Sequence, residues 1–295
     1  RLENDEEGGE AGEKRETNSE GSKAVALAMI LSFGTNVGLL ILKTYVAIST
    51  GSVTLLASAA DSLLDIFSGA VLFFTERVAH QPFDPMKFPE GRTRIEPIGV
   101  IVFATIMFMS SLQIMFEAIK VLAEGERELD ITMTAYAIIF VTIVSKFLLM
   151  VYCRGVLAAV GDNGPVEAYA QDHMNDVITN TGSAIAVVLA TKVPSLWWMD
   201  SVGAGMIAVY IMASWVETGK GQVEQLTGRT ADTSFISTLT HIAANHDERI
   251  VAVDTVRAYY FGARYLVEIH ICLDQNMTLR ECHDIGESLE VSIEQ

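Results

Sequence analysis

The chain of 295 residues is apolar, with a mean hydropathy of +0.34, yet it carries a formal net charge of −17. Half of its residues are hydrophobic and only 19% are charged, against about 25% in typical soluble domains, so its charges must gather in a few polar segments and a uniform soluble globule is excluded. The three cysteines, Cys153, Cys272 and Cys282, form no C-x-x-C pair, which argues against a disulfide framework.

Residues 1–23 are rich in Glu and Gly and cannot bury enough apolar surface to fold alone, so we expect an acidic, disordered N-terminal tail. Six mostly apolar segments follow, each long enough to cross the roughly 30 Å hydrocarbon core of a bilayer. The fifth is the least apolar. The sequence thus predicts a transmembrane domain over residues 24–218, with spans at Ala24–Ser49, Ser52–Thr75, Ile95–Leu122, Ile131–Cys153, Pro165–Ala190 and Leu196–Val216.

Basic residues indicate the orientation of these spans. The loop after the second span holds Arg92 and Arg94, the loop after the fourth begins at Arg154, and Lys220 follows the sixth. The loop Ala123–Asp130 on the opposite side is mostly acidic. We therefore expect both termini in the cytoplasm.

Residues 219–295 read as a small cytoplasmic domain. An amphipathic helix begins near Asp232, and two β-rich runs are joined by a hairpin signal at Phe261-Gly262-Ala263. A second helix begins after Thr278, with Glu281 three residues on as a capping box. This order of helix, strand, strand and helix is most of a ferredoxin-like α/β unit.

Four aspartates stand inside two of the predicted spans, where ionisable residues are costly and mark function by default. Asp61 and Asp65 lie in the second span, and Asp172 and Asp176 in the fifth. Each pair is spaced i, i+4 and so shares one helix face. At about 1.5 Å per residue, the two pairs lie roughly 13–19 Å and 14–20 Å below the outer surface of a 30 Å core.

Carboxylates converging at one depth repel one another, and a divalent cation that prefers oxygen ligands relieves this repulsion. Without metal, some of them would hold protons, which metal binding would release. These residues therefore predict a metal site coupled to protons. The alternative is that each aspartate makes a local hydrogen bond, which does not account for the matched depths.

Two weaker signals lie nearby. Asn36, mid-way along the first span, could add an amide oxygen to the metal site or make an interhelical hydrogen bond. His173 lies about 100° around the helix from Asp172, so we expect it to contact a neighbouring helix.

The motifs DSLLD, FPEGRTRIEPIG and DHMND, with the C-terminal run VDTVRAYYFGARYLVEIHI, resemble the cation diffusion facilitator family. The resemblance implies six spans and a cytoplasmic ferredoxin-like domain, with Asp61, Asp65, Asp172 and Asp176 as ligands of the transported ion. Asp at all four positions is similar to the manganese subgroup, which includes plant metal tolerance proteins, whereas zinc members typically carry His. The family's closing strand is missing before Gln295, so we expect a truncated C-terminal domain.

We therefore expect a homodimeric carrier that exports Mn²⁺ from the cytoplasm, with protons as the counter-ion. It would lie in an endomembrane, vacuole or Golgi, rather than in the plasma membrane, and would bind no nucleic acid. The alternatives are a zinc, iron or cobalt carrier on the same scaffold, or a membrane metal sensor or scaffold that does not transport. The sequence shows no nucleophile–base pair or phosphate loop, so we do not expect an enzyme.

Overall fold

A computed structural model describes residues 3–50, 53–89, 91–125, 133–161, 163–192 and 198–294. The chain divides into two compact units, Arg1–Gln222 and Val223–Gln295. The first unit is built from long helices and the second combines helices with a small sheet.

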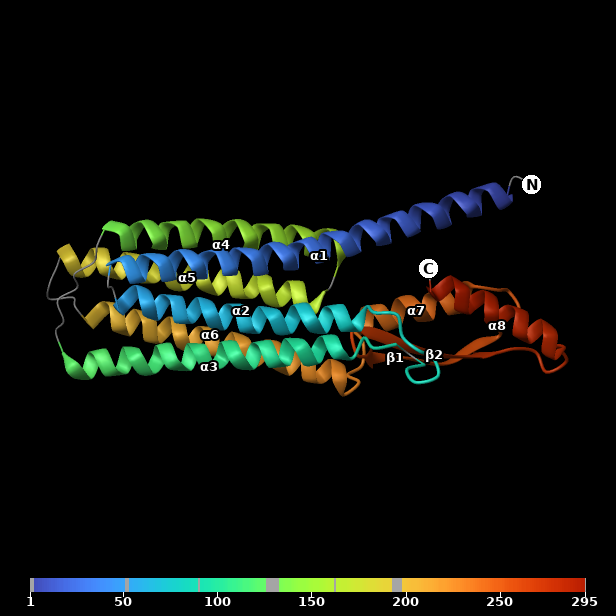
Figure 1. Ribbon diagram of the computed structural model, residues 1–295. Coiled ribbons are helices and arrows are strands. Elements are labelled where there is room, and N and C mark those ends of the chain that lie inside the picture. The colour runs from blue at the N-terminus through green and yellow to red at the C-terminus, as the bar shows by residue number, and fades with distance from the viewer. Residues whose placement is uncertain are drawn as a thin grey trace. The chain divides into compact units, whose positions relative to one another are not determined.

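Six long helices form the first unit and lie side by side as a bundle (Figure 1). Each of the six contains most of one segment that the sequence predicts as a span. They are α1 (Glu3–Thr50), α2 (Val53–Ala79), α3 (Ile95–Glu124), α4 (Met133–Val160), α5 (Gly164–Lys192) and α6 (Trp198–Leu226).

The helix α1 begins at Glu3, so residues 3–23 of the predicted tail lie in the same helix as the first span. The predicted tail lacks proline and contains seven Glu, two Lys and two Arg, which are good helix formers and outnumber its four Gly. Adding residues to an existing helix avoids the cost of a new nucleus. The apolar span that follows can therefore extend its helix backward through a polar sequence.

Helix α6 likewise continues beyond the predicted end of the sixth span at Val216 and ends at Leu226. The stop is Gly228, whose φ of 78° lies in the left-handed region that favours glycine after a helix. The boundary between the two compact units lies after Gln222, within α6 and a few residues beyond the predicted domain boundary at 218.

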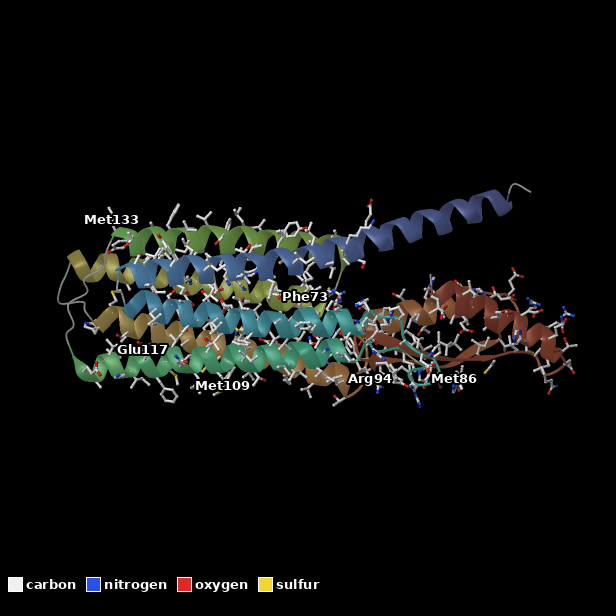
Figure 2. All side chains as sticks on the ribbon, in the orientation of Figure 1. Phe73, Met86, Arg94, Met109, Glu117 and Met133 are labelled. Atoms are coloured by element: carbon white, nitrogen blue, oxygen red, sulfur yellow. The ribbon has the colours of Figure 1, made fainter. Side chains whose placement is uncertain are left out.

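The bundle has an apolar outer surface and a largely apolar core, and its charged and polar residues inside the spans are buried within that core, as expected of a protein in lipid. Met109 of α3 and Met133 of α4 project outward (Figure 2), and the side chain of Phe140 is 68% exposed. The buried residues of the bundle include several charged or polar ones: Asn36, Lys43, Glu76, Glu96, Lys146, Asp172, His173 and Gln222. An apolar outer surface together with these buried polar groups supports a membrane environment.

Five of the described helices, all but α5 among α1–α6, are long and apolar enough to cross a membrane. Helix α5 is long enough to cross a membrane but is less apolar than the other five. From Pro165 to Asn180, Glu167 is the one exposed residue. Because its neighbours shield this segment from lipid, α5 tolerates the polar residues that made the fifth span weak in the sequence.

The second unit has the predicted order: α7 (Thr233–Asn245), β1 (Ala252–Phe261), β2 (Arg264–Cys272) and α8 (Leu279–Glu294). The strands pair antiparallel around Gly262, whose φ is 74°. The capping box is confirmed, since Glu281 N donates to Thr278 Oγ1 and Thr278 N donates to Glu281 Oε2. The latter bond lowers the pKa of the Glu281 carboxyl. Buried Ala231, Leu239 and Ala258 form the core.

Candidate metal site

Helices α2 and α5 run antiparallel, and one hydrogen bond fixes their relative height. The Tyr169 hydroxyl donates to Gly69 O at 2.9 Å. A Cβ added at Gly69 would lie 2.8 Å from that hydroxyl, so the contact requires glycine. Asp65 lies four residues before Gly69 on α2, and residue 173 lies four residues after Tyr169 on α5, so these two positions are level. In the same way, Asp61 is level with residue 177. The two aspartate pairs therefore occupy the same layer of the bundle.

Three of the four aspartates converge on one buried ammonium group. Lys146 Nζ of α4 lies 3.2 Å from Asp65 Oδ2 and 3.7 Å from Asp172 Oδ2, and it also forms an ion pair with Asp176 Oδ2. The side chains of Lys146 and Asp172 are each 2% exposed. Carboxylates from two helices and a lysine from a third thus form a single desolvated charge cluster.

Asp61 stands apart from this cluster. It is exposed, one helical turn before Asp65 on α2, and no ion pair joins it to the described part of the chain. Its neighbour Ser62 accepts a hydrogen bond of 2.9 Å from the buried Lys43 Nζ of α1. Lys43 interacts electrostatically with Asp61, Asp65 and Asp176, so it contributes a second positive charge to the same region.

His173 behaves as the sequence predicts and contacts a neighbouring helix. It is buried, and its Nε2 lies 2.9 Å from Ser32 Oγ of α1. Its Nδ1 lies 3.9 Å from Asp172 Oδ2 and has no hydrogen-bond partner among the described residues. Asp172, His173 and Asp176 each offer a ligand atom within 4.8 Å of the others, so the imidazole is a possible ligand.

Asn36 lies one turn after Ser32 on α1 and is 1% exposed. Because Ser32 contacts His173 and the two helices run in the same direction, Asn36 comes level with Asp176. Its Oδ1 is buried without a hydrogen-bond partner in the described residues. This unsatisfied oxygen favours a ligand role over a structural hydrogen bond through Oδ1.

The sequence interpretation missed Lys43 and Lys146. The signal for Lys146 was present, because a lysine in the middle of a span falls under the same rule that singled out the aspartates. Lys43 lies near the end of the predicted first span, where a long side chain commonly reaches the membrane interface. Its inward position depends on Ser62 of the facing helix and was not visible from α1 alone.

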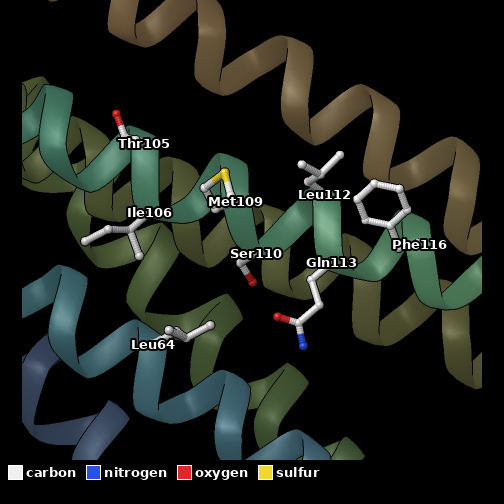
Figure 3. A pocket seen from close by; sticks show the side chains of 8 residues that line it. All are labelled: Leu64, Thr105, Ile106, Met109, Ser110, Leu112, Gln113 and Phe116. Atoms are coloured by element: carbon white, nitrogen blue, oxygen red, sulfur yellow. The ribbon is translucent and has the colours of Figure 1, made fainter.

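Two other features of the bundle are distinct from this cluster. A groove of about 450 Å³ lies between α2 and α3 (Figure 3), and its lining has no charged residue that could hold a cation. Glu76, His80 and Glu96 offer three ligand atoms near one another where α2 ends and α3 begins, but the side chain of His80 is 57% exposed. Of these three features, the cluster around Lys146 is the one that contains aspartates predicted as metal ligands.

Comparison with known proteins accounts for both units. Residues 29–227 match the cation efflux transmembrane domain, and residues 231–295 match the cation efflux protein cytoplasmic domain. The chain is 41% identical over 278 residues to Metal tolerance protein 10 of Arabidopsis thaliana, covering 93% of this chain and 63% of that protein.

Two further relatives give similar figures. Identity is 41% over 271 residues to Metal tolerance protein 3 of Oryza sativa subsp. japonica, covering 90% and 64% of the two chains. It is 38% over 278 residues to Metal tolerance protein 11 of Arabidopsis thaliana, covering 92% and 68%. The chain thus spans less than two thirds of the first two relatives. The transmembrane match alone covers well over half of the sequence, which confirms the resemblance seen in the motifs: the chain belongs to the cation efflux family.

Proposed function

We propose that this chain carries a divalent metal ion, Mn²⁺, across a membrane out of the cytoplasm. The observation that carries the proposal is the meeting of Asp65, Asp172 and Asp176 inside a bundle whose outer surface is apolar. Charged groups in such a place mark ion pathways. Family membership and the relatives' printed names, which refer to metal tolerance, support a metal as the ion.

The proposed ligands are Asp65, Asp172 and Asp176, with Asp61 and the amide oxygen of Asn36 completing the set. Carboxylate and amide oxygens suit Mn²⁺, which accepts octahedral oxygen coordination. Asp61, which is the exposed member, lies nearest the outer surface and is proposed as the last ligand that an exported ion would leave. Closure of the site around the ion would bring Asp61 toward the other three.

Proton exchange is proposed from the same cluster. Buried carboxylates must release their protons to bind a metal, so metal movement in one direction accompanies proton movement in the other. This gives an antiporter that alternates between inward- and outward-open states. The cytoplasmic unit is proposed to hold two copies together as a homodimer, with both termini in the cytoplasm. Removal of excess metal into an enclosed vacuole or Golgi compartment fits metal tolerance, so we place the protein there.

One observation favours a second candidate, a zinc carrier on the same scaffold. His173 Nδ1 is buried and unpartnered in the described chain, and it lies near Asp172 and Asp176. Zinc gains more than manganese from a nitrogen ligand. Replacement of His173 by Gln, which keeps a polar contact toward Ser32, should leave Mn²⁺ flux in place but strongly reduce flux in a zinc carrier that ligates through Nδ1.

The deciding experiment is flux of Mn²⁺, Zn²⁺, Fe²⁺ and Co²⁺ into proteoliposomes that contain the purified chain, with and without an imposed pH gradient. We expect Mn²⁺ uptake that rises when the receiving compartment is acidified. Uptake of zinc in preference to manganese would favour the second candidate. If none of the metals is transported, a membrane sensor or scaffold is the remaining candidate function. Metal flux that neither moves protons nor responds to a pH gradient would contradict antiport.

A further inference from the structure

We propose that the ammonium group of Lys146 is a tethered substitute for the transported ion, which the incoming metal must displace from the aspartates. The inference rests on the proposed function, since it takes the aspartates to be the metal ligands. It adds to that function a built-in competitor that sets how tightly the metal binds and how readily it leaves.

The geometry places Lys146 where a metal would bind. Its Nζ contacts one oxygen from each of Asp65, Asp172 and Asp176. A divalent ion bound to those same oxygens lies about 2.0–2.6 Å from each of them. It would then stand within a few ångströms of Nζ, where two positive charges in a desolvated site repel strongly. Metal and ammonium therefore cannot occupy this position together.

The lysine side chain is suited to leaving and returning. It is a compact charge on a flexible four-carbon stem, so Nζ can swing away while its backbone stays fixed in α4. Once displaced, it remains close enough to neutralise part of the surrounding charge. If all are ionised, Lys43 and Lys146 leave the four aspartates with an excess of two negative charges, which one divalent ion balances.

Such a competitor has a kinetic consequence. In the metal-free protein the ammonium keeps the aspartates together, so the cluster is not a set of unpaired buried charges. When a metal is bound, the return of the ammonium assists its release. The apparent affinity is weakened by the fraction of protein in which Lys146 holds the site. A carrier benefits from this arrangement, because an ion that binds too tightly does not leave.

The test is Mn²⁺ binding to the purified full chain in detergent, followed through the paramagnetic resonance signal of free Mn²⁺ at fixed pH. Lys146→Met removes the charge and keeps the length, and we expect its dissociation constant to fall at least tenfold below that of the parent. Lys146→Arg keeps a cation and should bind no more tightly than the parent. Lys120→Met, an exposed lysine paired with Glu124 on α3, is the matched control and should not change binding.

Transport supplies a second readout that a purely structural role would not give. In proteoliposomes, Lys146→Met should lower both KM and the maximal rate, because binding tightens and release slows. If Lys146→Met folds only when Mn²⁺ is present during purification, the metal replaces the ammonium and the inference holds. Failure to fold even with Mn²⁺ would show that the lysine is a structural counter-ion and overturn it.

The remaining outcomes separate the inference from the function on which it rests. A parent protein that binds Mn²⁺, together with a Lys146→Met variant that binds it equally or more weakly, would overturn the competitor while leaving the carrier intact. A parent protein that binds no divalent metal would instead refute the proposed function itself.

Discussion

At the scale of single residues, the members of the central cluster depend on one another. Asp172 is nearly inaccessible, and its Oδ1 has no hydrogen-bond partner in the described chain, while Oδ2 faces Lys146. A buried carboxylate with a spare oxygen is costly unless a cation completes its environment. The side chain of Asp176 is more accessible, at 25% exposed, so the cluster opens toward one side.

Neutralising any one of Asp65, Asp172 and Asp176 should therefore weaken metal binding. Replacement by Asn keeps the shape and removes one charge, and we expect Mn²⁺ affinity to fall by at least about tenfold, a loss typical of even an outer partner of a metal site. Equilibrium binding and vesicle flux measure this. Glu124→Gln, at the far end of α3, is the control. Parental flux in Asp65→Asn or Asp172→Asn would remove those residues from the site.

Selectivity is also decided at this scale. Zinc binds a given site more tightly than manganese, so the proposed preference for manganese would have to come from ligand type and geometry. Asp172→His exchanges an oxygen ligand for nitrogen at the same helical position, and we expect a higher ratio of zinc to manganese flux. Asp61→His should act in the same direction. Equal free metal in the same vesicles is required, and an unchanged ratio in both variants would show that these ligands do not select the ion.

At the scale of elements, the spacing of residues predicted which helices carry the site but not what lies between them. The i, i+4 aspartates identified α2 and α5, and the estimated depths anticipated their common layer. The partners from α1 and α4 could not be found this way, because they depend on how each helix is rotated about its axis. Helix ends were also missed, since α1 and α6 extend through polar residues that hydropathy excludes.

The contact between Tyr169 and Gly69 aligns α2 with α5, so its loss should affect both stability and transport. Tyr169→Phe removes one buried hydrogen bond, for which we expect a loss of about 1 kcal/mol and a fall in melting temperature of about 2–4 °C. Maximal flux should also fall, because the aspartate pairs are held less firmly at one height.

Tyr152→Phe is the matched control for this prediction. Tyr152 packs against the same hydrophobic core, and no hydrogen bond of its hydroxyl is found among the described residues. Thermal unfolding in detergent and vesicle flux compare the two variants directly. Equal stability and flux in Tyr169→Phe and Tyr152→Phe would show that the contact with Gly69 does not position the helices.

At the scale of the whole molecule, the orientation of the bundle still depends on loop charges. Arg92 and Arg94 precede α3, and Arg154 lies near the end of α4, at the end of the bundle beyond which the N-terminal part of α1 extends (Figure 1). The acidic residues expected on the opposite side, Glu126–Asp130, and the segment after Lys192 lie outside the described residues. The orientation is therefore best tested on the native cysteines of the chain.

Cys272 is exposed and Cys282 half-buried in the cytoplasmic unit, whereas Cys153 is buried in the bundle. With both termini in the cytoplasm, a membrane-impermeant maleimide applied to sealed vesicles should label Cys272 from the cytoplasmic face, and Cys153 should stay protected. In a variant that carries Cys272→Ser and Cys282→Ser, a cysteine introduced as Glu126→Cys should react only from the opposite face. This pattern requires an odd number of crossings between Glu126 and Cys272, namely α4, α5 and α6, so it also tests whether the polar helix α5 crosses the membrane. Labelling of Cys272 and of the introduced cysteine from the same face would mean an even number of crossings between Glu126 and Cys272, and one of α4, α5 and α6 would have to be withdrawn as a span.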